Sequence, residues 1–301
     1  MMERVPSPSG APRDPRLRAG MYAATVVLPI VCALLVLGTW IGAPVAERAP
    51  ILWAALVSLA AGFAATSIGV YGGVLVPGLL LMGVDARFAA AASLFLQLLV
   101  IPLGAGAHLS LGNVTRRIAV PLIAGGMLGA FVGPFLAAGL PKEATARVVA
   151  GAIVAVGLLV LATLRFGGMR SIVPAEEVPR AKVAGVGLVA GFASGISGAG
   201  WGPIGVKLLI LLRIEPRQAI GSSMLGRVFM SAAAVIGYVL SATAFHDIVP
   251  DYWLILPLFA GSIAAMVPGV FLVTQMKRER AVIAITLLSI GLALPVLIRG
   301  H

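Results

Sequence analysis

A long hydrophobic pattern occurs twice in this chain. Residues 60–94 read AAGFAATSIGVYGGVLVPGLLLMGVDARFAAAASL, and residues 189–224 read VAGFASGISGAGWGPIGVKLLILLRIEPRQAIGSSM. Ser93 in the first copy and Ser223 in the second are 130 residues apart (223 − 93). In each copy an apolar helix runs into a glycine-rich break, restarts as a short apolar segment, turns, and begins a long helix. A duplicated, broken hydrophobic unit in a membrane protein is typical of secondary transporters.

The composition places the chain in a membrane. Hydrophobic residues make up 60% of it and charged residues only 11%, which excludes an ordinary soluble protein. All the acidic residues fall in predicted loops, helix ends or tails, as expected if the bilayer excludes charge. The net charge of +11 is therefore interpreted as cytoplasmic loops facing anionic lipid, and nucleic acid is not an expected partner. The single cysteine, Cys32, is expected to pack as a small apolar residue.

The N-terminal part precedes the duplicated units. Residues 1–20 form a basic tail, and residues 21–41 are almost wholly apolar. This arrangement also resembles a signal peptide, with 43–46 as the cleavage site. An apolar signal region usually spans about 7–15 residues, however, and this one is longer. We therefore expect a retained first transmembrane helix with a cytoplasmic N-terminus.

Seven continuous apolar segments, including 21–41, are long enough to cross a bilayer, which takes about 20 apolar residues. Segments 52–82 and 182–213 instead hold one helix, a break and a short restart. If both are re-entrant hairpins, 15 basic residues face the cytoplasm and 5 face outward, whereas single crossings give 12 and 8; the positive-inside rule favours re-entrant hairpins. The seven continuous segments are 21–41, 87–107, 117–139, 143–166, 217–242, 252–273 and 280–298.

These spans predict the fold class: an all-α integral membrane protein with two repeats of opposite orientation. Each repeat is a Gly-broken re-entrant hairpin plus three transmembrane helices, and one extra helix precedes them. The predicted parts are the tail 1–20, the helix 21–41, the first repeat 52–166, a cytoplasmic linker 167–181 and the second repeat 182–298. The predicted location is the inner cell membrane, crossed many times.

The residues around the breaks resemble the sulfite exporter TauE/SafE family of membrane transporters. The resemblance rests on 67–73 and 197–202, each followed by an apolar half-helix, and then on 85–93 and 215–223. It covers about 52–298, and the second copy is the better match, since Ala86 stands where the second copy has Pro216. The resemblance implies a transporter of small anions, of the sulfite or organosulfur class, without naming the anion.

Two cations lie inside predicted membrane segments, Arg227 and Lys207. An arginine at the membrane centre costs about 2.5–3.5 kcal/mol even on the mildest scale, so we expect a transported anion to supply the negative charge at Arg227. The alternative is that Arg227 caps carbonyl groups of a broken helix. Lys207 either attracts the anion or extends its ammonium group to the interface.

The long helix after each break carries a polar stripe. Arg227 follows Ser223 by one turn, and Gln97 follows Ser93 in the same way in the first copy. Hydroxyl and amide groups on facing helices can replace water around an oxyanion, although small polar residues also let membrane helices approach closely. With Arg227 and Gln97 included, a pore-lining face is favoured. The stripes are Ser223, Arg227, Ala234 and Tyr238, with Ser222 beside them, and Ser93, Gln97, Gly104 and His108.

The breaks themselves offer backbone chemistry. Half-helices that start near Val74 and Pro203 direct N–H groups toward the membrane centre, where they can bind an anion. The glycines Gly72, Gly73, Gly200 and Gly202 permit close approach of a ligand. If the repeats are inverted, the two tips meet. The Gly187-x-x-x-Gly191-x-x-x-Gly195 pattern predicts tight helix packing.

The sequence therefore predicts a secondary transporter, with export as the expected direction, of a small anion by alternating access. A passive anion channel and a non-transporting membrane protein are the alternatives. Membrane carboxylates, catalytic dyads and metal-ligand clusters are missing from the sequence, so no enzyme activity, cofactor or metal is expected. The expected partners are the anion and membrane lipid, and a homo-oligomer is left open.

Overall fold

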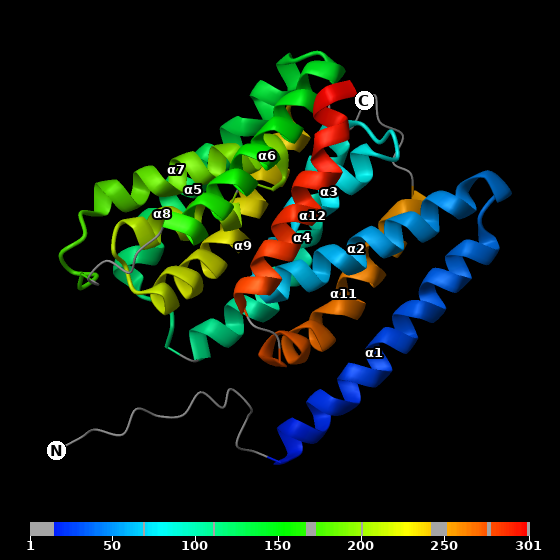
Figure 1. Ribbon diagram of the computed structural model, residues 1–301, viewed down its shortest axis with the longest axis horizontal. Helices are drawn as coiled ribbons and strands as arrows, with labels where there is room; N and C mark the ends of the chain where they lie inside the picture. Colours follow the sequence, from blue (N-terminus) through cyan, green and yellow to red (C-terminus); the bar gives the residue numbers. More distant parts are fainter. Residues whose placement is uncertain are drawn as a thin grey trace.

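The computed structural model describes residues 15–68, 70–110, 112–166, 173–199, 201–241, 252–275 and 278–299. Within these ranges the chain is helical and contains no β-strand (Figure 1). Each continuous segment predicted to cross the membrane is one helix, and the largest difference is at the first, which begins at Pro15. The elements are α1 (Pro15–Gly42), η1 (Val45–Glu47), α2 (Arg48–Ile68), α3 (Gly72–Leu80), α4 (Ala86–Ser110), α5 (Arg116–Gly139), α6 (Lys142–Phe166), α7 (Arg180–Ser197), η2 (Trp201–Gly205), α8 (Val206–Leu211), α9 (Pro216–Leu240), α11 (Tyr252–Gln275) and α12 (Arg278–Arg299).

Both predicted breaks are present. The first separates α2 from α3, which begins at Gly72, and the second separates α7 from the π-helical turn η2 and the short α8. At the second break Gly198 has a left-handed backbone (φ 66°), and its N–H donates to the carbonyl of Ser194 at 2.7 Å. This is the usual glycine termination of a helix. With 9 and 6 residues, α3 and α8 are too short to cross a bilayer alone.

The turn that follows each half-helix is duplicated in its hydrogen bonds. Gly83 donates to Leu80 and Val84 to Leu79 in the first copy; in the second, Arg213 donates to Ile210 and Ile214 to Leu209. Each pair of equivalent residues is 130 apart, as for Gly83 and Arg213 (213 − 83). Both residues are left-handed, with φ 79° at Gly83 and φ 67° at Arg213. The hydrophobic repeat seen in the sequence is therefore also a repeat of local structure.

Glycines bring α5 and α7 into backbone contact, as the G-x-x-x-G pattern predicted. A Cβ atom on Gly191 would overlap the carbonyl oxygen of Gly126, and one on Gly195 would lie 2.6 Å from that of Ala130. Gly187 meets the carbonyl of Leu122 in the same way. Because each of these positions faces backbone rather than a flexible side chain, none tolerates a side chain without separation of the two helices.

The first helix of each repeat packs on a helix of the other repeat. Helix α7, the first of the second repeat, packs on α5 of the first repeat, and α2, the first of the first repeat, packs on α11 of the second. In the α2–α11 pair, Gly62 meets the backbone of Ser262, and Gly261 meets the backbone of Ala55. Helices α4 and α9 pack on one another, as do α6 and α12. Each hairpin is thus held by a helix of the other repeat.

Helix α1 lies at one edge of the molecule, against α11 and α2 (Figure 1). Cys32 on α1 is buried together with Ala260 and Ala264 on α11. The expectation that Cys32 packs as a small apolar residue is confirmed. Exposed apolar residues, such as Leu34 at 62%, cover the other side of α1, which suits contact with lipid.

Length and composition allow several helices to cross a membrane. Among the described residues, four helical stretches are both long enough and apolar enough to cross a membrane, and shorter apolar helices accompany them. Their exposed surfaces carry large apolar side chains, for example Leu56 at 62% and Leu128 at 59% exposure. The four stretches are Val45–Ala65, Arg116–Gly139, Glu143–Ala162 and Arg217–Leu240.

Candidate substrate site at the two helix breaks

The two breaks touch one another. A Cβ atom on Gly72, the first residue of α3, would overlap the carbonyl oxygen of Gly198 and would lie 2.8 Å from the hydroxyl of Ser93. Gly198 in turn lies against the backbone of Ala90 on α4. The two breaks, which the sequence analysis expected to meet if the repeats are inverted, are in contact at Gly72 and Gly198. Glycine is required here because two backbones are in contact.

Two predicted site residues on α4 hold the second break. Ser93 donates its hydroxyl to the carbonyl of Gly198 at 3.0 Å, and the amide nitrogen of Gln97 donates to the same oxygen at 3.1 Å and to Ser93 Oγ at 3.2 Å. Both side chains are buried. In this arrangement Ser93 and Gln97 satisfy a carbonyl that the end of α7 leaves without an intrahelical partner, and they position the break.

The stripe on α9 contains one more polar residue than the sequence analysis recognised, Ser231. Ser223, Arg227 and Ser231 follow one another at intervals of four residues on α9 and are 1%, 3% and 0% exposed, so they share one helix face. Arg227 is eleven residues from Pro216, about 17 Å along the helix axis. The hydroxyls of Ser223 and Ser231 have no hydrogen-bond partner among the described residues.

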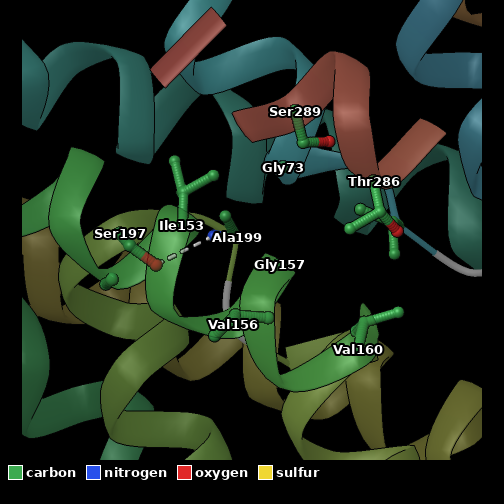
Figure 2. Close-up of a pocket in the computed structure, with 11 residues that line it drawn as sticks. Gly73, Ile153, Val156, Gly157, Val160, Ser197, Ala199, Thr286 and Ser289 are labelled. Carbon is green, nitrogen blue, oxygen red and sulfur yellow. Dashed lines mark hydrogen bonds between the residues drawn. The ribbon is translucent and has the colours of Figure 1, made fainter. Parts of the chain in front are cut away.

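A small pocket joins the two breaks (Figure 2). Its volume is about 20 Å³, room for about one water molecule. Ser197 donates to the carbonyl of Ala193 at 2.7 Å and accepts from the N–H of Ala199 at 3.2 Å. Thr286 and Ser289 on α12 face it from the other side (Figure 2). The lining is completed by Val70, Gly73, Ala152, Ile153, Val156, Gly157 and Val160.

An aromatic residue begins the restart after each break. Tyr71 and Trp201, 130 residues apart (201 − 71), are each 1% exposed. The hydroxyl of Tyr71 lies 2.6 Å from Ser262 Oγ on α11, and Trp201 Nε1 donates to the carbonyl of Ser223 at 2.9 Å. Trp201 also packs against Gly126 on α5. Tyr71 therefore anchors its half-helix to the other repeat, whereas Trp201 hydrogen-bonds within its own repeat and packs on the other at Gly126.

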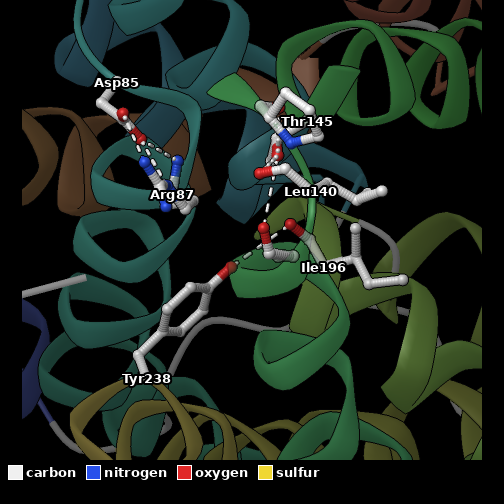
Figure 3. Close-up of polar contacts among 8 residues, drawn as sticks. Asp85, Arg87, Leu140, Thr145, Ile196 and Tyr238 are labelled. Atoms are coloured by element: carbon white, nitrogen blue, oxygen red, sulfur yellow. Dashed lines mark hydrogen bonds and ion pairs between the residues drawn. The ribbon is translucent and has the colours of Figure 1, made fainter. Parts of the chain in front are cut away.

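Tyr238, at the far end of the α9 stripe, fastens α9 to the end of α7 (Figure 3). Its hydroxyl donates to the carbonyl of Gly195 at 2.8 Å and lies 3.3 Å from that of Ile196. In Figure 3 the ion pair between Asp85 and Arg87 lies at the start of α4. Asp85 also accepts the backbone N–H of Arg87 at 2.9 Å, so this carboxylate caps the helix.

The remaining predicted residues occupy different places. Ser222 accepts the backbone N–H of Thr115 at 3.2 Å, so its hydroxyl is engaged at the start of α5 rather than at a break. Lys207 is partly buried on α8. Gly73 lines the pocket, Gly202 belongs to the π-helical turn, and Gly200 lies outside the described residues.

The sequence analysis missed three polar residues that lie on the α9 stripe or line the pocket between the breaks. Ser231 lies one turn after Arg227 within the α9 stripe, but its equivalent in the first copy is Ile101 (231 − 130), so a search for duplicated polar positions passes over it. Extension of the four-residue spacing from Arg227 would have found it. Thr286 and Ser289 carry no comparable signal, because α12 brings them to the breaks only through tertiary packing.

Comparison with known proteins agrees with this architecture. The family model described as Sulfite exporter TauE/SafE matches residues 54–294. The chain belongs to the sulfite exporter TauE/SafE family. It is also 27% identical over 218 residues, 71% of each chain, to the "Probable membrane transporter protein YtnM" of Bacillus subtilis (strain 168). No solved structure matches.

Membership of the TauE/SafE family makes this chain a multi-pass membrane protein of a transporter type. The matched region, 54–294, contains both breaks, both stripes and the pocket. Helix α1 (Pro15–Gly42) precedes the matched region.

Proposed function

We propose that this protein is a secondary transporter of a small anion of the sulfite or organosulfur class, and that Arg227 supplies the principal charge of its site. The observation that supports this most directly is a guanidinium buried to 3% exposure halfway along α9. Ser223 and Ser231 flank it with buried hydroxyls that have no partner among the described residues. One permanent positive charge between two hydroxyl donors suits an oxyanion.

Arg227 also interacts with other groups of the protein. A guanidinium has five N–H donors in a planar fork, so an anion can share Arg227 with those groups. The attraction between Arg227 and an anion is stronger inside the membrane than in water, because Coulomb energy increases where the dielectric constant is low. Lys207, on the short helix α8 after the second break, is proposed to attract the anion toward the site.

Alternating access is the proposed mechanism. The duplicated turns and the exchanged packing of α2 and α7 support two repeats of opposite orientation, each carrying one hairpin. With Gly72 against Gly198, the pocket between the breaks has a volume of only about 20 Å³, so the described conformation is closed around this point. Passage of an anion then requires one hairpin to move relative to the other, as in transporters with discontinuous helices.

Counterflow in proteoliposomes tests this proposal. Vesicles that contain the purified protein are loaded with unlabelled sulfite, and uptake of labelled sulfite or of a small labelled sulfonate is followed. A carrier predicts saturable uptake that depends on the internal anion, whereas protein-free vesicles show none. Ohmic anion conductance without counterflow would contradict the carrier mechanism, and the absence of any flux with sulfite and sulfonates would contradict the substrate class.

A further inference from the structure

A basic pocket lies between the N-terminal ends of α5 and α7, at the opposite end of α7 from the second break. It has a volume of about 440 Å³ and is lined by Arg116, Arg117, Val120, Pro121 and Arg180. Three of its five lining residues are arginines, although only 11% of the chain is charged. Such a concentration of one charge within one pocket is the signature of an anion-binding site.

The packing of α5 on α7 explains why these arginines are close. Gly125 on α5 meets Ala184 on α7, and eight residues later Gly133 meets Ile196. The two helices are therefore parallel, and they begin at the same level, with Arg116 and Arg180 as their first residues. Two helix N-termini side by side add their partial positive charges to those of the arginines.

The three arginines differ in their partners. Arg117 is fixed by the linker, because its guanidinium donates to the carbonyls of Ala175 and Glu176. Arg116 and Arg180 are exposed, and neither forms a hydrogen bond or ion pair with any residue that the structure describes. The exposed carboxylates of Glu176 and Glu177 form no ion pair with them either. Two guanidinium groups are thus available at the rim of the pocket.

The remaining wall is apolar and continues along the membrane-facing side of α5. Val120 is 63% exposed, and Leu128 and Val132, which follow it by about two and three turns, are 59% and 44% exposed. A ligand that fills the pocket therefore meets positive charge at one end and a lipid-facing apolar stripe at the other. Only an amphipathic anion satisfies both parts, because a free inorganic anion leaves the apolar wall without a partner.

We propose that this pocket binds the phosphate of an anionic phospholipid headgroup, with the acyl chains lying along the exposed stripe of α5. Arg116 and Arg180 bind the phosphate oxygens, and Arg117, itself held by the carbonyls of Ala175 and Glu176, adds its charge to the pocket lining. The positive-inside rule places this end of α5 and α7 at the cytoplasmic leaflet, where anionic lipids attract basic residues. Bound lipid then joins the first repeat, through α5, to the second, through α7.

Thermal unfolding of the purified full-length protein in neutral detergent, with added phosphatidylglycerol, tests the proposal. Phosphatidylglycerol is expected to raise the unfolding midpoint of the wild type more than phosphatidylcholine does. Arg116→Gln with Arg180→Gln should weaken the lipid response about 25-fold in the concentration required, since each arginine near a charged membrane surface contributes about five-fold. Arg147→Gln with Arg299→Gln, which removes the same charge from two exposed arginines elsewhere, is the matched control and should respond as the wild type does.

The outcomes are distinct. An equal loss of response in both double variants would show a general charge effect and would overturn the proposal. A full response to inorganic phosphate alone would show a free-anion site and would overturn it as well. Equal unfolding midpoints of the pocket variant and the wild type in phosphatidylcholine would establish that the substitutions leave the fold intact. Native mass spectrometry provides a second readout, in which phosphatidylglycerol is retained by the wild type and the control but not by the pocket variant.

Discussion

The amide nitrogen of Gln97 on α4 lies 3.1 Å from the carbonyl oxygen of Gly198 at the end of α7, and this bond joins a helix of the first repeat to the break of the second. The equivalent of Gln97 in the second repeat is Arg227 (97 + 130). One repeat therefore has a neutral amide at this position and the other a permanent cation. The difference between these two residues underlies the account of the site.

Removal of the Gln97 amide is expected to destabilise the second break. Gln97→Met keeps a similar volume but removes one of the two hydrogen bonds to the carbonyl of Gly198, which keeps only that from Ser93; the loss of one such bond costs about 0.5–1.5 kcal/mol. The unfolding midpoint in detergent should fall. Gln218→Met, at a partly exposed position on α9, is the control and should leave the midpoint unchanged. An equal fall in both variants would contradict the assigned role.

Gly72→Ala is expected to force the two breaks apart. Its Cβ would overlap the carbonyl oxygen of Gly198, which is backbone and cannot rotate away. Expression of folded protein and counterflow should both decrease. Gly185→Ala on α7, where a Cβ meets nothing within 4 Å, should instead be neutral or stabilise by about 1 kcal/mol through helix propensity. Normal stability and flux in Gly72→Ala would show that the breaks are not in close contact in the membrane.

The duplicated turns predict opposite effects of two substitutions. Arg213 has a left-handed backbone (φ 67°), which costs a non-glycine residue about 1 kcal/mol, so Arg213→Gly should raise the unfolding midpoint. Gly83 occupies the equivalent position with φ 79°, and a Cβ added there would meet nothing within 4 Å. Gly83→Ala should therefore lower the unfolding midpoint by backbone strain alone. Two changes in the same direction would contradict the structural equivalence of these turns.

Ser231→Ala should affect transport without affecting stability. The Ser231 hydroxyl has no partner among the described residues, so its removal breaks no described hydrogen bond, but an anion at Arg227 would lose a donor. The expected result is a KM for the anion raised by about 3- to 10-fold, consistent with about 0.5–1.5 kcal/mol for one hydrogen bond. Ser262→Ala removes the hydrogen-bond partner of the Tyr71 hydroxyl and should do the reverse, lowering the unfolding midpoint with little change in KM.

The repeated pattern was sufficient to predict the helices and the breaks. Apolar segments of membrane length and glycine-rich interruptions are local signals, and the structure places helices and breaks where they indicated. A meeting of the two breaks was expected if the repeats are inverted, but the contact of Gly72 with Gly198 itself was not predicted. Hydrogen bonds of individual side chains did not follow, because they depend on tertiary packing: both serines are buried, but Ser222 accepts from the N–H of Thr115, while the Ser223 hydroxyl has no partner among the described residues.

Arg227 itself was found from the sequence because a charge within an apolar helix is conspicuous. Gln97 was found only through the repeat. Its hydrogen bond to the carbonyl of Gly198, which positions the second break, was not predicted by the spacing. The pocket between the breaks is also lined by residues of α6 and α12, which lie far from the breaks in sequence. No periodicity links Thr286 or Ser289 to Ser197, so their convergence required the structure.

Flux and binding of sulfite in the Arg227→Gln variant test the central claim most directly, because this substitution gives the second repeat the residue that the first repeat has at the equivalent position. If Arg227 only caps backbone carbonyls, glutamine can replace it as Gln97 does, and transport should survive. If Arg227 binds the anion, Arg227→Gln should remain folded, with an unfolding midpoint near that of the wild type, and should lose saturable counterflow, while Arg227→Lys retains part of it. Unchanged binding and flux in Arg227→Gln would contradict the account.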